Sequence, residues 1–288
     1  MKRFLIIDGN TYIYRSYYAI PPFFTAKNQQ INAVYGFINL LLKINSKFNP
    51  DYFTICFDHP AITFRKKIFK NYKANRKPID DALINQIPII KEGMKALNIN
   101  IIEAEGYEAD DSIATLVEIN KNENIQIIIV TGDKDILQLV NDTNILIWND
   151  SKNIMYNAKK VIEKYGIAPC QLSDFFALTG DIADNIPGIK GIGKVTAMKL
   201  IKKFGNVENI LQNINFINGK IGKLLLYGQD KMWLSKKLIK LNKQVPINYK
   251  LKNFENKNSD KEKAIAFFKK YRFKSLLTKY CKRLRNSS

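Results

Sequence analysis

Nine acidic residues stand in five short motifs spread over the first two thirds of the sequence. The motifs span residues 7–10, 57–58, 106–111, 131–135 and 179–185, and their acids are Asp8, Asp58, Glu108, Asp110, Asp111, Asp133, Asp135, Asp181 and Asp184. Each motif alone has an ordinary structural explanation, because Asp caps helices, acidic residues favour a helix start and Gly-Asp is common in turns. Their importance therefore depends on whether the fold brings them together.

Acids gathered at one place would repel one another strongly unless cations lay among them. Oxygen ligands without His or Cys favour Mg²⁺ or Mn²⁺ over zinc. Two Mg²⁺ ions balance only part of this charge, so some acids are expected to act through bound water. Two ions roughly 4 Å apart can activate a water and clamp a phosphate, which suffices for phosphodiester hydrolysis. The single histidine, His59, is expected to be structural rather than a catalytic base.

Short apolar runs rich in β-branched residues precede three of the motifs, at residues 4–7, 52–57 and 127–131. Such runs are typical of buried parallel strands. Residues 34–42 and 113–117, which lie between them, carry apolar side chains at helical spacing. Alternating strands and helices predict an α/β fold with a doubly wound, mainly parallel sheet. The carboxyl ends of its strands share one edge, where Asp8, Asp58 and Asp133 are expected to converge.

The strand pattern ends after about residue 165. From there the sequence shows short helical segments separated by Gly, Pro and Asn. We therefore expect an α/β domain over residues 1–168 and a smaller helical region over residues 169–288.

The chain carries 46 Lys and Arg against 26 Asp and Glu, a formal charge of +20. This excess favours a polyanionic partner, although a general bias toward Lys, Asn and Ile contributes to it. Three widely spaced cysteines, Cys56, Cys170 and Cys281, fit free thiols in a reducing cytosol. The apolar run before Asp8 is too short for a signal peptide or a membrane span, so we expect a cytoplasmic protein without membrane contact.

Two basic segments are candidates for phosphate binding. Residues 65–77 contain seven cations and no acid, among them Arg65, Lys66, Lys67, Lys70, Lys73 and Arg76. A solvated charge run is the alternative, but the position just after Asp58 favours cations that hold a phosphate at the acidic edge. The second segment, residues 185–197, is rich in glycine, which lets backbone N–H groups approach a phosphate. Its candidates are Gly188, Lys190, Gly191, Gly193 and Lys194.

Taken together, these motifs resemble the 5′ to 3′ exonuclease domain of bacterial DNA polymerase I and the related flap endonucleases. The resemblance rests on Asp8-Gly-Asn, residues 64–76 with Tyr72-Lys-Ala-Asn-Arg76, Gly106-Tyr-Glu-Ala-Asp-Asp111, Thr131-Gly-Asp-Lys-Asp135, Thr179-Gly-Asp, Asp184-Asn-Ile-Pro-Gly188 and Gly191-Ile-Gly-Lys194. Residues 267–274 resemble the last helix of that domain, so similarity extends over nearly the whole chain. The sequence ends where a polymerase I continues, which fits either a standalone enzyme or part of a polymerase.

The resemblance implies a function and a distribution of roles. Asp8, Asp58, Glu108 and Asp110 would surround a first metal ion, and Asp111, Asp133, Asp135, Asp181 and Asp184 a second. Residues from about 60 to 80 would form a helical arch for the 5′ strand, with Lys73 and Arg76 on the scissile phosphate. Residues from about 185 to 205 would form a helix-hairpin-helix-type element that grips duplex DNA, with a K⁺ ion. The substrate would be DNA with a free 5′ end, a 5′ flap or a nick, including RNA primers, cut by a monomer that works beside a separate DNA polymerase and ligase on the bacterial nucleoid.

The sequence bears on three other functions. A catalytically weak protein that recognises branched DNA would be expected to lack acids of the second group, and none is missing. A haloacid-dehalogenase-like phosphatase needs a second Asp two positions after Asp8, where Asn10 stands. The acidic motifs alone do not exclude a nuclease directed at RNA, although the Gly-rich and Lys-rich second region favours duplex DNA.

Overall fold

A six-stranded sheet forms the centre of the computed structural model, which describes residues 1–256 and 260–286. The strands lie in the order β3-β2-β1-β4-β5-β6, and β6 alone runs antiparallel to its neighbour. Their bounds are β1 (Lys2–Asp8), β2 (Tyr52–Cys56), β3 (Asn100–Ile102), β4 (Ile125–Val130), β5 (Ile145–Asn149) and β6 (Ile154–Tyr156). The predicted doubly wound, mainly parallel sheet is thus confirmed.

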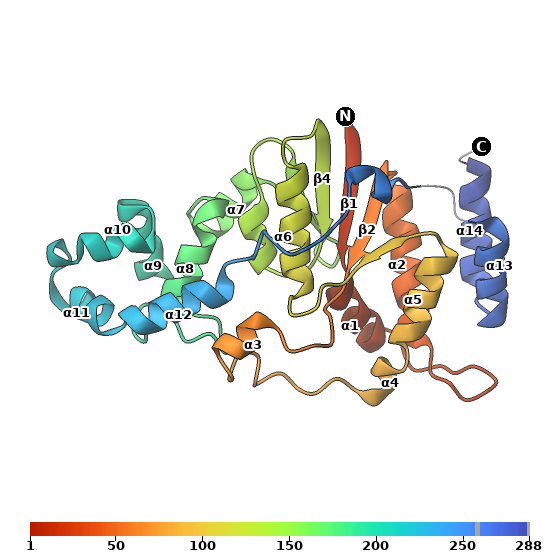
Figure 1. Ribbon diagram of the computed structural model, residues 1–288, viewed down its shortest axis with the longest axis horizontal. Coiled ribbons are helices and arrows are strands. Elements are labelled where there is room, and N and C mark those ends of the chain that lie inside the picture. Colours follow the sequence, from red (N-terminus) through yellow and green to blue (C-terminus); the bar gives the residue numbers. More distant parts are fainter. Residues whose placement is uncertain (257–259, 287–288) are drawn as a thin grey trace.

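Apolar residues on both faces of β1 explain why this strand lies at the middle of the sheet. Phe4 and Ile6 pack into the core on one face, whereas Leu5 and Ile7 pack into the core on the other. Helices α1 (Gly9–Ala19), α2 (Asn32–Phe48) and α5 (Ile87–Ala96) cover the second face, and α6 (Ala109–Asn120) covers the first (Figure 1). Burial on both faces accounts for the uninterrupted apolar run in the sequence.

A group of short helices follows β6 and lies at the left of Figure 1. Its elements are α7 (Ala158–Tyr165), η2 (Pro169–Gln171), α8 (Leu172–Thr179), α9 (Lys194–Phe204), α10 (Val207–Gln212), η3 (Ile214–Phe216), α11 (Gly219–Tyr227) and α12 (Gln229–Ile239). The Gly-rich segment, residues 185–197, forms the turn between α8 and α9 and the start of α9. Within the described ranges the structure shows no strand beyond residue 156, as the sequence predicted.

The last two helices return to the α/β domain, so the prediction of a single helical region over residues 169–288 is wrong at its C-terminal end. After η4 (Leu251–Phe254), helices α13 (Lys261–Lys270) and α14 (Lys274–Asn286) pack on α2 and α5, at the far right of Figure 1. Phe267, Phe268 and Tyr280 become buried there. Their burial explains the return, because three large aromatic side chains supply much of the contact area.

The predicted helical arch over about residues 60–80 is helical only in its first part. Helix α3 (Phe64–Ile68) has five residues, turns follow up to residue 76, and α4 (Asp81–Ile84) is a single turn. Lys73 has a φ of 55°, and its N–H donates to the carbonyl oxygen of Asp184 at 2.9 Å, which ends any regular helix there. Pro78 further disfavours helix at the residue before it.

Candidate active site

Asp8 lies at the carboxyl end of β1 and caps the following helix. It accepts hydrogen bonds from Thr11 N (3.2 Å), Thr11 Oγ1 (2.5 Å) and Thr131 Oγ1 (2.6 Å), and it is 3% exposed. The ordinary explanation as a helix cap therefore holds. The contact with Thr131 also links the ends of β1 and β4, so this capping residue lies at the edge where the acidic motifs meet.

The loop after β2 is tied to the starts of two helices through Asp58. One oxygen of Asp58 accepts from Ala109 N at 2.7 Å, at the start of α6, and the other accepts from Asn10 Nδ2 at 3.0 Å. The Asp58 N–H donates in return to Asn10 Oδ1 at 2.8 Å. Beside it, His59 Nδ1 accepts from the N–H of Ala61 at 3.2 Å, a local turn contact that fits the structural role expected for this residue.

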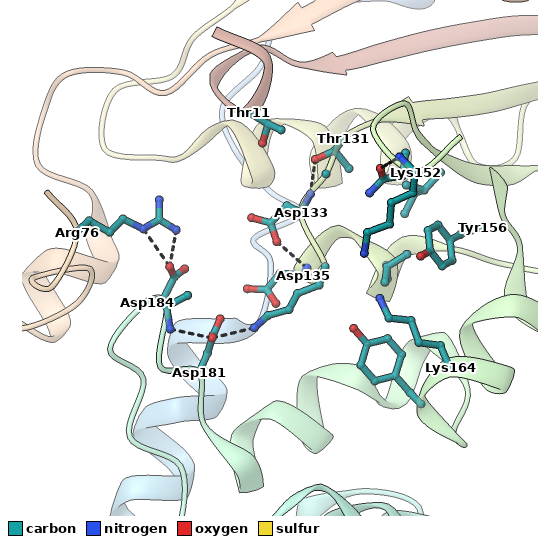
Figure 2. Close-up of a pocket in the computed structure, with 17 residues that line it drawn as sticks. Thr11, Arg76, Thr131, Asp133, Asp135, Lys152, Tyr156, Lys164, Asp181 and Asp184 are labelled. Atoms are coloured by element: carbon teal, nitrogen blue, oxygen red, sulfur yellow. Dashed lines mark hydrogen bonds and ion pairs between the residues drawn. The ribbon is translucent and has the colours of Figure 1, made fainter. Parts of the chain in front are cut away.

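The tightest group of acids is formed by Asp135, Asp181 and Asp184. One carboxylate oxygen from each lies within 4.8 Å of the other two, as Figure 2 allows the reader to follow. Burial and the neighbouring Asp133 raise the pKa of Asp135 to about 8. One oxygen of Asp135 is buried and has no hydrogen-bond partner among the described residues. A buried acceptor without a donor is rare, and a cation would satisfy it, so the residues present fit a divalent metal ion.

Two further acids adjoin this group. Burial and the charges of Asp133 and Asp8 raise the pKa of Asp110 well above its ordinary value. Burial likewise raises the pKa of Asp133, with Asp8 and Asp184 adding to the effect. These mutual influences show that α6, β1, β4 and the segment after α8 bring their acids to one place, as the sequence predicted for the sheet edge.

Three cations reach into the acidic edge, two from the basic segment at residues 65–77 and one from the segment after β4. Lys73 Nζ lies 2.8 Å from Glu108 Oε1 and 4.0 Å from Asp184. Arg76 donates from two nitrogens to Asp184, and Lys134 Nζ lies 2.8 Å from Asp181. Although burial acts in the opposite direction, Lys73 and Arg65 hold the pKa of Glu108 below its ordinary value. Lys134 was not among the predicted site residues, because it stands between two aspartates of an acidic motif.

Arg65 was predicted to contact DNA, and this prediction is wrong because the side chain is 1% exposed. Its Nη1 and Nη2 donate to the two oxygens of Asp111 at 2.6 and 2.7 Å, and its Nε donates to the carbonyl oxygen of Leu238 at 2.7 Å. Glu108 and the carbonyl oxygen of Lys240 accept its remaining hydrogen bonds, at 3.0 and 3.3 Å. All five N–H groups of the guanidinium are thereby used inside the protein.

Asp111 was predicted to be a ligand of the second metal, and the structure contradicts this too. It is 0% exposed, and besides Arg65 its oxygens accept from Asn242 N at 2.8 Å and Glu108 N at 3.2 Å. Both oxygens are thus fully engaged. Tyr72, which was named only as part of a family motif and without a role of its own, completes this buried network by donating from its hydroxyl to Glu108 at 3.0 Å.

The remaining candidates for DNA contact divide by exposure. Lys67, Lys70, Lys190 and Lys194 are exposed, and so are Gly191 and Gly193 at the start of α9. Lys66 is partly buried and donates to the carbonyl oxygen of Tyr72 at 3.0 Å.

Gly188 is a correction. It is buried, its N–H donates to Ser235 Oγ at 2.9 Å, and an added Cβ would lie 2.2 Å from the backbone of Gly180. This glycine serves close backbone packing rather than phosphate binding.

Two family models together match residues 3–262 of the chain. The family model for the N-terminal resolvase-like domain of 5′–3′ exonucleases matches residues 3–166, and the model for their C-terminal SAM fold matches residues 167–262. The fold and the acidic edge thus define a domain pair found in nucleases, and the chain belongs to the 5′–3′ exonuclease family. The resemblance inferred from the motifs is confirmed.

Two curated relatives differ in length. A DNA polymerase I of Caldicellulosiruptor bescii is 41% identical over 281 residues, which is 96% of this chain but 33% of that protein. A 5′–3′ exonuclease of Aquifex aeolicus is 38% identical over 288 residues, covering 100% of this chain and 98% of that protein. The chain therefore spans about a third of the polymerase and nearly all of the exonuclease.

Solved structures support the same fold. T5 5′-exonuclease with bound zinc superimposes with a TM-score of 0.70 at 20% identity, covering 84% of this chain and 90% of that one. The catalytic core of Rad2 in complex with a DNA substrate gives a TM-score of 0.62 at 19% identity, covering 94% of this chain and 87% of that one.

In the described part of this chain, no helix has the length and apolar character needed to cross a membrane.

Proposed function

We propose that this protein is a divalent-metal-dependent 5′ nuclease that hydrolyses DNA phosphodiester bonds as a 5′ to 3′ exonuclease and a 5′-flap endonuclease. The observation that carries the proposal is the group of Asp135, Asp181 and Asp184 with its unpartnered buried oxygen. Family membership supports the reaction. A T5 flap endonuclease of similar fold has been solved with DNA and metal ions, which supports the substrate class.

The acids are proposed to hold two Mg²⁺ ions, for which Mn²⁺ can substitute. Asp133, Asp135, Asp181 and Asp184 would hold one ion, and Asp8, Asp58, Glu108 and Asp110 the other. Asp111 is left out because Arg65 and backbone N–H groups occupy both of its oxygens. When bound, such ions lower the pKa of a water molecule and stabilise charge on a phosphate.

Lys73 and Arg76 are proposed to act on the phosphate. Both are within hydrogen-bond distance of the acids, so their charged ends already point to where a phosphate would meet the metal ions. Replacement of a carboxylate partner by a phosphate would keep each cation paired and would neutralise charge that develops on the non-bridging oxygens. Lys134, held by Asp181, would orient that acid.

The start of α9 is proposed to bind duplex DNA. Gly193 caps this helix without a side chain, an added Cβ there would meet nothing within 4 Å, and Lys190 and Lys194 flank it. Open backbone N–H groups at a helix start with lysines nearby suit a phosphate of any sequence. A K⁺ ion in this hairpin and a monomeric state remain part of the proposal.

Its cellular substrates would be nicks, 5′ flaps and RNA primers left during replication and repair in the bacterial cytosol, where a DNA polymerase and a ligase would act on the same sites. DNA polymerase I proteins among the relatives support this setting.

Single-turnover cleavage of a 5′-flap duplex labelled at its flap tests the proposal. We expect cutting near the junction with Mg²⁺, none with EDTA, and slower cutting when the 5′ end is blocked. Tight binding without cutting in Mg²⁺ or Mn²⁺ would instead favour the alternative function, recognition of branched DNA by a catalytically weak protein of the same fold.

A further inference from the structure

The pocket that holds the acids extends well beyond them. It encloses about 530 Å³ and has two chemically different halves. Asp133, Asp135, Asp181, Asp184 and Arg76 line one half. The other half is lined by two lysines and two tyrosines, Lys152, Tyr156, Lys164 and Tyr165. Lys152, Tyr156 and Lys164 stand apart from the acids on the right of Figure 2.

Both lysines are exposed, and their ammonium groups face this second half. Lys152 lies in the turn between β5 and β6, where its backbone N–H donates to Asn149 Oδ1 at 3.0 Å. Lys164 lies in the last turn of α7, with its Nζ 5.3 Å from the ring centre of Tyr156 and 4.9 Å from that of Tyr165. Figure 2 shows the two lysines pointing toward one another from different walls.

No acid compensates these two charges in the part of the chain that is described. Neither lysine forms an ion pair there, in contrast to Lys134, which is paired with Asp181. Asp150, the acid nearest to Lys152 in sequence, is bound instead by Arg15 and Lys43. Burial and the charges of Lys152, Lys134 and Lys194 lower the pKa of Lys164. An anion between the two ammonium groups would relieve this repulsion.

The lysine-lined half of the pocket adjoins both the acids and the segment that packs on α9. On one side, burial and the charges of Asp135 and Asp133 help to raise the pKa of Tyr165 to about 12. On the other side, Gly166, next to Tyr165, is packed so closely on α9 that an added Cβ would meet Met198 at 2.5 Å. A strand that runs from the acids toward α9 would therefore pass the two lysines.

We propose that Lys152 and Lys164 form a subsite for a backbone phosphate of the cut strand, on the 3′ side of the scissile phosphate. This inference rests on the proposed function, because it takes the strand's 5′ part to lie toward residues 64–76 and its duplex part toward α9. Arg76 approaches Asp184 from the opposite side of the pocket, as Figure 2 shows, and Lys73 Nζ lies 4.0 Å from the same acid, so the cut strand would be held by cations on both sides of the scissile bond. Tyr156 and Tyr165 fix the position of Lys164 rather than contact the phosphate.

The test asks whether loss of the two lysines and loss of the charge on one backbone phosphate affect the same interaction. Flap duplexes would carry one neutral methylphosphonate linkage, either at the first or second position 3′ of the cut or at the first position 5′ of it. Single-turnover rates would be compared for the wild type and the Lys152→Ala/Lys164→Ala double variant. We expect the double variant to cut normal DNA roughly tenfold more slowly than the wild type does, as loss of a charge-assisted hydrogen bond would predict. We expect the wild type to be slowed by a similar factor on DNA with a 3′ methylphosphonate. Combined, the two changes should slow cutting little further.

The Lys159→Ala/Lys160→Ala variant is the matched control, since it removes two exposed charges from the same helix, outside the pocket. It should respond to each methylphosphonate as the wild type does. The subsite would be overturned if the rate reductions caused by the double variant and by the 3′ methylphosphonate multiplied when combined. It would also be overturned if the double variant were insensitive to the 5′ methylphosphonate instead, or if it cut normal DNA at the wild-type rate.

Binding in Ca²⁺ distinguishes failure of the subsite from failure of the proposed function. If the wild type does not cut the unmodified flap, the nuclease proposal fails. The affinity for the flap duplex in Ca²⁺ would then be compared for the same variants and the same DNAs. A combined loss of affinity no larger than either single loss would still support the phosphate subsite, and losses that multiply would overturn it. Thermal unfolding of the double variant checks that both lysines can be replaced without loss of the fold.

Discussion

Asp111 and Asp135 come from neighbouring acidic motifs but occupy opposite electrostatic settings. Asp111 is fully buried, and its oxygens are filled by a guanidinium and by backbone N–H groups. Asp135 keeps one buried oxygen without a partner, and its pKa is raised to about 8 by burial and by Asp133. Asp111, whose charge is balanced by Arg65, contributes to stability, whereas Asp135, whose charge no group of the protein balances fully, is suited to bind a cation from solution.

The largest expected effect falls on the compensated region. Arg65→Gln would leave Asp111 and Glu108 buried with one fewer charged partner, which should lower the free energy of unfolding by about 3–5 kcal/mol. Urea unfolding measures this change. Lys67→Gln, which alters an exposed residue of the same short helix, should change stability by less than about 0.5 kcal/mol. Equal effects of the two substitutions would remove the distinction between the regions.

The uncompensated region should respond in activity instead of stability. Asp135→Asn removes a proposed metal ligand, so single-turnover cleavage should fall by at least about a hundredfold, while flap binding persists. Stability without metal should be unchanged or higher, because the substitution relieves repulsion. Asp142→Asn, at an exposed position, is the control. Wild-type cleavage by Asp135→Asn would exclude this acid from the metal site.

Lys73 joins the two regions, because it pairs with Glu108 of the network and lies near Asp184 of the metal site. Lys73→Ala should slow cleavage about ten- to a hundredfold, the cost of one hydrogen bond to a charged group. Lys95→Ala, on the exposed side of α5, should leave the rate unchanged. An unaltered single-turnover rate for Lys73→Ala would limit this lysine to a role in folding.

A smaller effect is expected from pH and metal. The pKa of Asp135 rises from 3.8 to about 8 on folding, so its ionisation opposes folding increasingly as pH rises from about 4 to about 8. Mg²⁺ should cancel this cost, and the increase in melting temperature between EDTA and Mg²⁺ should be larger at pH 8.5 than at pH 6, by a few degrees. An increase that is independent of pH would place the ion away from Asp135.

The sequence predicted the sheet and the edge where acids gather, because buried parallel strands leave a strong apolar pattern and their ends must meet. The sequence could not show that Asp110 and Asp111 have different roles. The two are adjacent, but a helix turns successive side chains in different directions, and only the fold shows what each direction meets. Arg65 looked like its basic neighbours for a similar reason. Only the fold shows that Arg65 faces the inside of the protein, where the carbonyl oxygens of Leu238 and Lys240 accept its hydrogen bonds.

The C-terminal helices were misplaced because the pattern of α13 and α14 shows an apolar face but not what that face covers. Lys152 and Lys164 were missed because no sequence motif joins them, and their meeting depends on how β6 and α7 pack. Predictions from spacing thus succeeded where chemistry repeats along the chain and failed where single residues meet across the fold.

The most direct test of this account locates the metal. Crystals soaked in Mn²⁺ would be measured for anomalous scattering, which identifies each ion and its ligands. We expect an ion bound by Asp135, Asp181 and Asp184, and none bound by Asp111. An ion on Asp111, or no ion at the three aspartates while Mn²⁺ supports cleavage, would contradict it.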